Sequence, residues 1–215
     1  MKGGRFAYPA VLDLRGRRAV VVGGGRVALR KARALLAAGA SVRVVAPKLV
    51  AALKRDPRIE CRAGPYRKRH LRGAILVIAA TDDEGVNARI AADARAAGAL
   101  VNVVDRPEEC DFIVPSQVRR GDLVIAVTTG GAAPSLSRRI RERLERQFGP
   151  EYARLLAALR RVRQDLKARG LAPAVRRRIF ERLTRDDVVA AARRGPAALR
   201  RAIVKAVAAE GRPPA

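Results

Sequence analysis

Short apolar runs alternate with amphipathic stretches through the first half of this chain. Runs rich in Val, Ile and Ala predict strands at residues 18–24, 41–46, 58–63, 74–80 and 99–104. Between them the spacing of apolar positions predicts helices at residues 26–38 and 84–97, each followed by glycine, and a short helix around residues 48–55. Strands separated by helices pair in parallel through right-handed crossovers, so the pattern predicts an α/β fold with a doubly wound parallel sheet.

The pattern changes after Asp105. Residues 111–131 hold two apolar runs joined by the turn-like RRGD, which predicts an antiparallel hairpin outside the first sheet. A helix is predicted over residues 134–148, and the rest of the chain is helical and rich in Arg and Ala. We therefore expect three parts: an α/β domain over residues 1–113, a small strand–helix segment over residues 114–148, and a helical C-terminal domain over residues 149–215.

The chain of 215 residues is strongly basic, with 46 Lys and Arg against 20 Asp and Glu, for a formal charge of +26. The excess of positive charge is present both before and after Gly149, since 17 basic and only 6 acidic residues lie from Gly149 onward. A nucleic acid, an acidic surface or a highly anionic small molecule would explain it, and so would arginine-rich helix faces in water. Aromatic residues are only 3%, which argues against base-stacking platforms.

Several classes of protein are disfavoured. No apolar run is long enough to cross a bilayer, and the N-terminus lacks a secretory pattern, so we expect no membrane partner and a cytoplasmic location. Cys61 and Cys110 are an isolated pair, reduced by default in that compartment. With His70 as the one histidine, we predict no protein-built metal site and a surface position for His70.

The sequence GGGRVA follows the first strand and begins the first helix. It fits G-x-G-x-x-A at Gly23, Gly25 and Ala28, the turn that holds a dinucleotide pyrophosphate in Rossmann-like folds. The first glycine permits the tight turn, the second admits the pyrophosphate, and the small Ala28 allows close helix–strand packing.

The acid that normally binds the adenosine ribose at the end of the second strand is missing, because position 46 is Ala. Ribose recognition then falls to the backbone at Ala46 and Pro47 or to the side chain of Lys48. Both NAD and NADP remain possible as cofactors. An equally good interpretation of Lys48 is an ordinary solvent-facing residue.

Four motifs lie at strand ends, where this fold binds ligands: the glycine turn, AATDDEGVN, VNVVDRPEECDFIVPS and VTTGGAAPSLSRRIRE. Their residues, order and spacing from about Tyr8 to Arg143 resemble the precorrin-2 dehydrogenase family, the N-terminal module of siroheme synthases. The resemblance implies oxidation of precorrin-2, a polycarboxylate tetrapyrrole, to sirohydrochlorin with NAD. It also implies a homodimer that uses the strand–helix segment, and, in some members, insertion of Fe²⁺ as a substrate.

Carried over onto this chain, the family motifs assign Asp105 as catalytic, either as the base that accepts a proton or as a guide for Fe²⁺. The alternative is an Asp that caps the turn at Pro107. The motifs place Thr129, Gly130 and Gly131 at the substrate. The expected cofactor contacts are Gly23, Gly24, Gly25, Arg26, Val27, Ala28, Ala46, Pro47, Lys48, Thr81 and Asn87.

Other residues have structural interpretations. Asp82 and Asp83 precede a predicted helix, so we favour capping for Asp83 and a favourable dipole interaction for Asp82. Cys110 is interpreted as structural or incidental. Thr129 stands where many relatives have a serine that is phosphorylated in some, and its own modification stays open. Arginines in or beside the four motifs are candidates for binding the carboxylates of the substrate: Arg106, Arg119, Arg120, Arg138 and Arg139.

Two further functions remain as alternatives. An NAD-binding sensor without turnover would explain the glycine turn but not VNVVD. A nucleic-acid protein would use the charge, but no recognition motif stands in the arginine-rich helices, so we expect no nucleic-acid partner.

Overall fold

The structure is a computed structural model that describes residues 8–210, and it consists of two compact units. The first extends to Val114 and the second begins at Pro115. A further division of the second unit near residue 148 stays a prediction.

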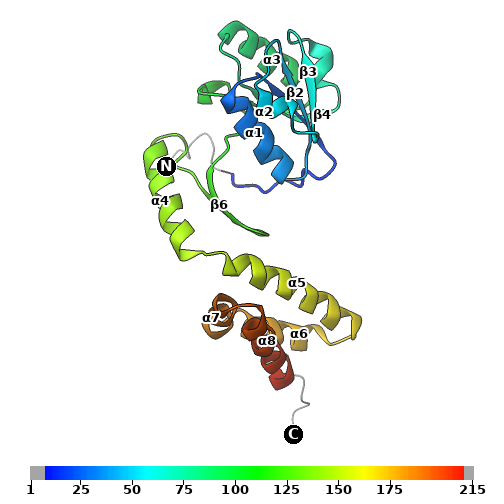
Figure 1. Cartoon of the computed structure of the whole chain (residues 1–215), viewed down its shortest axis with the longest axis vertical. Coiled ribbons are helices and arrows are strands. Elements are labelled where there is room, and N and C mark those ends of the chain that lie inside the picture. The colour runs from blue at the N-terminus through cyan, green and yellow to red at the C-terminus, as the bar shows by residue number, and fades with distance from the viewer. Residues whose placement is uncertain (1–7, 211–215) are drawn as a thin grey trace. The chain divides into compact units, whose positions relative to one another are not determined.

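The first unit is built on a parallel sheet (Figure 1). Its strands are β1 (Arg18–Val22), β2 (Ser41–Ala46), β3 (Ile59–Ala63), β4 (Ala74–Ala79) and β5 (Leu100–Val103), in the order β3-β2-β1-β4-β5. All four neighbouring pairs are parallel. The order reverses at β1, between β2 and β4, and ligands bind at such a switch point in doubly wound sheets. The predicted fold class is confirmed.

Helices cover both faces of this sheet. On one face α1 (Arg26–Ala37) and α2 (Ala51–Lys54) pack through residues such as Ala28, Ala32 and Leu53. On the other face α3 (Glu84–Ala96) packs with the single-turn 3₁₀ helix η1 (Lys68–Leu71). A second 3₁₀ turn, η2 (Pro107–Glu109), follows β5. The helix predicted around residues 48–55 is shorter than expected, because residues 48–50 are not helical: Lys48 lies in a bend, and Val50 is extended with its amide donating to the Gly24 carbonyl.

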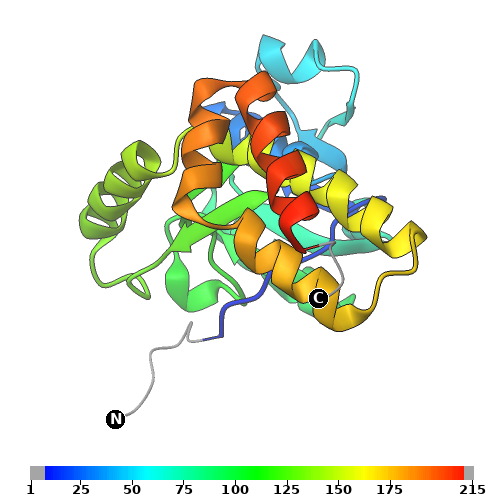
Figure 2. The same cartoon turned by 90° about the horizontal axis from the view of Figure 1, so that it is seen from below.

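The second unit contains the predicted hairpin and the helical remainder. Strands β6 (Ser116–Arg120) and β7 (Leu123–Val127) pair antiparallel. The helices that follow are α4 (Pro134–Gln147), α5 (Glu151–Ala168), α6 (Pro173–Leu183), α7 (Asp186–Arg194) and α8 (Pro196–Glu210). Figure 2 shows α7 and α8 side by side, and the last four helices share a core that includes Leu155, Ile179 and Leu183. None of the described helices combines the length and apolar character that a bilayer crossing requires.

Candidate functional site

A cavity of about 940 Å³ opens at the carboxyl end of the parallel sheet. The loops that follow β1, β2, β4 and β5 form its wall, and they bring together the glycine turn, the segment after Ala46, Thr81 and Asp105. Parallel strands end at one edge of the sheet, so residues distant in the chain meet there.

The first two glycines of the turn are required by close packing within the protein. Gly23 has φ +134°, and a Cβ there would lie 2.7 Å from the carbonyl carbon of Ala80. A Cβ on Gly24 would lie 2.9 Å from the carbonyl carbon of Lys48 and equally close to the Ala46 Cβ. These contacts are closer than nonbonded carbons allow, so neither position accepts a side chain unless the adjoining loop moves.

Gly25 differs, because a Cβ there would meet no protein atom within 4 Å. It is the N-cap of α1, and no side chain caps the helix and no acid stands in its first turn. Arg26 and Val27 line the same cavity. Amide N–H groups at an uncapped helix start, together with the helix dipole and a nearby guanidinium, suit a pyrophosphate. The geometry of the glycine turn is therefore suited to binding the pyrophosphate of a dinucleotide.

The remaining predicted cofactor residues fall into two groups. Ala46, Pro47, Lys48 and Thr81 line the cavity. Ala28 does not: it is fully buried between α1 and the sheet. Its small side chain therefore acts through packing, at a distance from the cavity.

Asn87 is also buried, and its side-chain amide hydrogen-bonds to Thr81. Its Nδ2 donates to the Thr81 carbonyl at 3.0 Å, and the Thr81 hydroxyl donates to its Oδ1 at 2.7 Å. Asn87 thus holds the loop after β4, and only Thr81 of the pair reaches the cavity. The predicted cap is confirmed, since Asp83 Oδ1 accepts from the Val86 amide at 2.9 Å.

Asp105 lies on the cavity wall in an unusual backbone conformation. Its φ of 60° makes it the one non-glycine residue of the described chain with positive φ. This conformation costs about 1–2 kcal/mol for a residue with a Cβ. Backbone bonds on either side hold it, from the Val104 amide to the Ala79 carbonyl and from the Arg106 amide to the Val103 carbonyl.

The Asp105 carboxylate is exposed and makes no hydrogen bond or ion pair within residues 8–210. The turn at Pro107 has Arg106 as its N-cap and no side-chain cap bond, so the alternative capping role of Asp105 is wrong. A strained residue whose polar group faces a cavity instead of bonding its own backbone is typical of a functional position.

Lys31 on α1 was not anticipated, although it lies electrostatically close to Asp105. Burial chiefly lowers the pKa of its amine, as does Arg30, while Cys110 and Asp105 act in the opposite direction. Its position three residues after Ala28 and four before Leu35, both buried, indicated that it faces inward.

Tyr66 and Arg89 also line the cavity without having been predicted. The Arg89 guanidinium lies 5.5 Å from the centre of the Tyr66 ring, and the Tyr66 hydroxyl donates to Asp93 at 3.0 Å. Burial, followed by the bond to Asp93, raises the pKa of Tyr66. No motif indicated either residue, since a loop and a helix bring them to the cavity only in the folded unit.

The predicted substrate residues belong to the second unit. The Thr129 hydroxyl accepts from the Ala133 amide at 3.0 Å and from the Ser137 hydroxyl at 3.2 Å, at the start of α4. Gly130 and Gly131 both have positive φ and open space around them. Their contact with substrate stays a prediction. Residues 8–210 contain no group of three or more His, Cys, Asp or Glu placed to hold a metal ion.

Comparison with known proteins gives consistent matches. Residues 10–116 match a family model described as "Putative NAD(P)-binding", and residues 120–147 match one described as "Sirohaem biosynthesis protein central". The siroheme synthase of Nitrosospira multiformis is 46% identical over 182 residues, which cover 81% of this chain and 39% of that protein. The siroheme synthase of Chromobacterium violaceum is 44% identical over 208 residues, which cover 95% and 44%.

One solved structure, titled as SirC, a precorrin-2 dehydrogenase, superimposes with a TM-score of 0.75 at 25% identity. The match covers 93% of this chain and 98% of that one. The chain spans about two fifths of the length of the curated siroheme synthases it matches.

Proposed function

Because this chain belongs to the precorrin-2 dehydrogenase and siroheme synthase N-terminal family, we propose that it oxidises precorrin-2 to sirohydrochlorin with NAD as the hydride acceptor. One observation carries the proposal: the open amide end of α1 and the unpaired carboxylate of Asp105 line the same cavity. The first group suits a pyrophosphate, and the second suits proton transfer at the reacting carbon.

The amides around Gly25 and the Arg26 guanidinium bind and orient the pyrophosphate, and the Asn87-supported loop at Thr81 closes the adjoining wall. NAD, when bound, accepts the hydride that the oxidation releases. Asp105 accepts the proton that leaves the tetrapyrrole, and its exposure lets substrate approach the carboxylate.

Burial chiefly lowers the pKa of the Lys31 amine and Asp105 raises it, so the two groups lie close enough for their charges to interact. Lys31 does not line the cavity, so we assign it no contact with cofactor or substrate.

The test is turnover under anaerobic conditions. Purified protein, precorrin-2 and NAD should yield NADH and sirohydrochlorin in equal amounts, with NADP run in parallel because Ala46 leaves no acid to reject a 2′-phosphate. NAD binding without turnover of the tetrapyrrole would instead support the sensor function.

We also propose that the enzyme works as a homodimer through β6, β7 and α4. The strand pair β6–β7 packs on α4 and α5, yet α4 buries only Ser137 of its 14 residues. Val124 and Leu136 are exposed in this segment, and a second copy would cover such apolar surface. Sedimentation of the full chain should give a dimer, and Leu136→Glu should weaken it. A monomer at micromolar concentration would contradict the proposal.

Insertion of Fe²⁺ into sirohydrochlorin is the second step that we propose for this cavity, with iron as a substrate. The support is again Asp105, whose unpaired oxygens can receive a hard cation or the pyrrole N–H protons. Anaerobic protein with sirohydrochlorin and Fe²⁺ should form siroheme faster than the uncatalysed reaction. An unchanged rate would confine the protein to the oxidation.

A further inference from the structure

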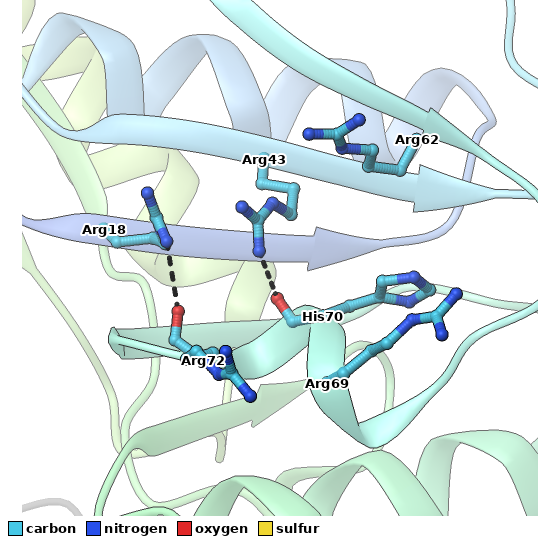
Figure 3. A pocket seen from close by; sticks show the side chains of 6 residues that line it. All are labelled: Arg18, Arg43, Arg62, Arg69, His70 and Arg72. Atoms are coloured by element: carbon cyan, nitrogen blue, oxygen red, sulfur yellow. Dashed lines mark hydrogen bonds between the residues drawn. The ribbon is translucent and has the colours of Figure 1, made fainter.

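A second cavity, of about 410 Å³, lies in the first unit, shares no lining residue with the candidate dinucleotide cavity, and is lined by basic residues. Figure 3 shows arginines from three neighbouring strands facing a turn that carries two more arginines and the one histidine. The lining residues are Arg18, Arg43, Arg62, Arg69, His70 and Arg72. None of these residues has a part in the function proposed above.

This cavity exists because the crossover from β3 to β4 contains only the single turn η1, where the other crossovers of this sheet contain α-helices. Val45 in β2 faces the core on the α3 side, and Arg43, two residues earlier, points to the same face of the sheet. An interior parallel strand normally places apolar residues on both faces. Arg43 is only 13% exposed, so the fold holds a guanidinium where a core residue is expected.

The cation excess is only partly neutralised within the unit. Glu60 pairs with Arg43 and Arg62, and it is the one carboxylate that the described residues place at ion-pair distance from this cluster. Arg43 also donates to the His70 carbonyl at 2.9 Å, and Arg18 donates to the Arg72 carbonyl at 3.2 Å. Two strand arginines are thereby fixed in position by backbone acceptors.

Other arginine N–H groups of the cluster lack a hydrogen bond or a carboxylate partner among residues 8–210. The Arg43 Nε lies 3.1 Å from Glu60 Oε2 but its N–H is not directed at the oxygen, so it is a buried donor without a hydrogen bond. Arg69 and Arg72 have no carboxylate partner anywhere in residues 8–210, and both are exposed to the cavity. Burial, and then the charges of Arg69, Arg43, Arg67 and Arg62, lower the pKa of His70. The electrostatic potential inside the cavity is thus strongly positive. Because Arg18 and Arg43 are already fixed in position, binding an anion costs these side chains little further conformational entropy.

We propose that this cavity is a binding site for a small polyanion that carries two or more phosphate or carboxylate groups. Guanidinium forks match both groups bidentately, and several forks converging on one space select for multiple charges. A cavity of this volume is within the range of small-ligand sites. A nucleobase has no place in it, because the lining offers no aromatic side chain besides the His70 imidazole, which packs edge-on against Tyr66.

The anion could come from two sources that share this chemistry. One is a free multivalent metabolite, and the other is the carboxylates of a tetrapyrrole substrate. Inorganic triphosphate, citrate and precorrin-2 are therefore the three probes.

The experiment uses the full-length protein and reads His70 directly. Because the chain has a single histidine, its imidazole proton signals in NMR report this cavity alone. Triphosphate should raise the pKa of His70 by placing negative charge beside it, and calorimetry should give a matching affinity. Arg69→Gln/Arg72→Gln, which changes exposed side chains, should weaken triphosphate binding about tenfold or more. The matched control is Arg33→Gln/Arg55→Gln, which removes the same charge from exposed sites around α1 and α2 and should leave the affinity unchanged.

A His70 pKa that triphosphate and citrate do not move, or equal weakening in the two double variants, overturns the proposal, since binding would then be absent or due to net charge alone. Binding that persists beside precorrin-2, with its KM unchanged in Arg69→Gln/Arg72→Gln, supports the site and assigns it to a free anion. A raised KM for precorrin-2, with competition by triphosphate, supports the site and assigns it to the substrate. The binding arms do not require turnover, so loss of the proposed oxidation would leave this result standing.

Discussion

Replacing single glycines of the turn separates folding from cofactor binding. In Gly25→Ala the added methyl group enters space that no protein atom within 4 Å occupies, at an N-cap with φ −87°. Alanine is a poorer N-cap than glycine, so the expected loss of stability is below about 1 kcal/mol. The same methyl group occupies the position through which a pyrophosphate must approach the helix amides. Losing one or two charge-assisted amide bonds weakens binding by about 2–4 kcal/mol, or about 30- to 1000-fold in Kd.

Gly24→Ala supplies the contrast. Its Cβ would lie 2.9 Å from both the Lys48 carbonyl carbon and the Ala46 Cβ, in a segment tied down by the bond from the Val50 amide to the Gly24 carbonyl. Overpacking of this kind costs about 1–3 kcal/mol, which lowers Tm by about 4–12 °C in a unit of this size.

The assay is calorimetric titration of each variant with NAD and NADH, together with thermal unfolding of the protein without added nucleotide. We expect Gly25→Ala to lose affinity with a fall in Tm of less than about 4 °C, and Gly24→Ala to show the larger fall in Tm. The reasoning would be refuted by a Gly25→Ala protein that binds NAD with the wild-type Kd, because the pyrophosphate then would not lie against the start of α1.

Three further predictions concern carboxylates. Asp105→Asn keeps a side chain that tolerates positive φ but removes the base, so NADH production should fall at least about 100-fold with Tm unchanged; a rate near that of the wild type would remove Asp105 from the chemistry. Asp83→Ala removes the N-cap of α3 and should reduce the free energy of unfolding by about 1 kcal/mol in urea, whereas Asp82→Ala, at an exposed position without that bond, should change it by less than half as much. Hydrogen bonds from Arg43 and Arg62 lower the pKa of Glu60 from its ordinary value of 4.5. The ionised carboxylate therefore stabilises the fold above pH 4.5, and this contribution is lost as the pH falls through the lower pKa of the folded state. In urea unfolding, the stability advantage of the wild type over Glu60→Gln should shrink below pH 4.5, and an advantage that is independent of pH would contradict the pairing.

The sequence alone determined the class of the fold and predicted which turn would hold a dinucleotide. Continuous β-branched runs and glycine-ended amphipathic helices are local patterns, and right-handed crossovers leave few ways to join them. The turn from Gly23 to Gly25 is equally local, because backbone conformation and close approach dictate those residues. The aspartate cap at Asp83 was readable for the same reason.

Only the tertiary structure decided which side chains share a space. Tyr66 and Arg89 reach the candidate dinucleotide cavity, and Lys31 comes close to its exposed carboxylate Asp105, from segments that no spacing along the chain connects. Ala28 and Asn87, which the motif placed at the cofactor, are buried and act one step behind it. His70, predicted at the surface, is half-buried in the arginine-lined cavity, which exists because a single 3₁₀ turn replaces a covering helix between β3 and β4. Local patterns set the conformation of each segment, but burial and charge depend on what packs against it, and that is settled only when the strands pair in the order β3-β2-β1-β4-β5.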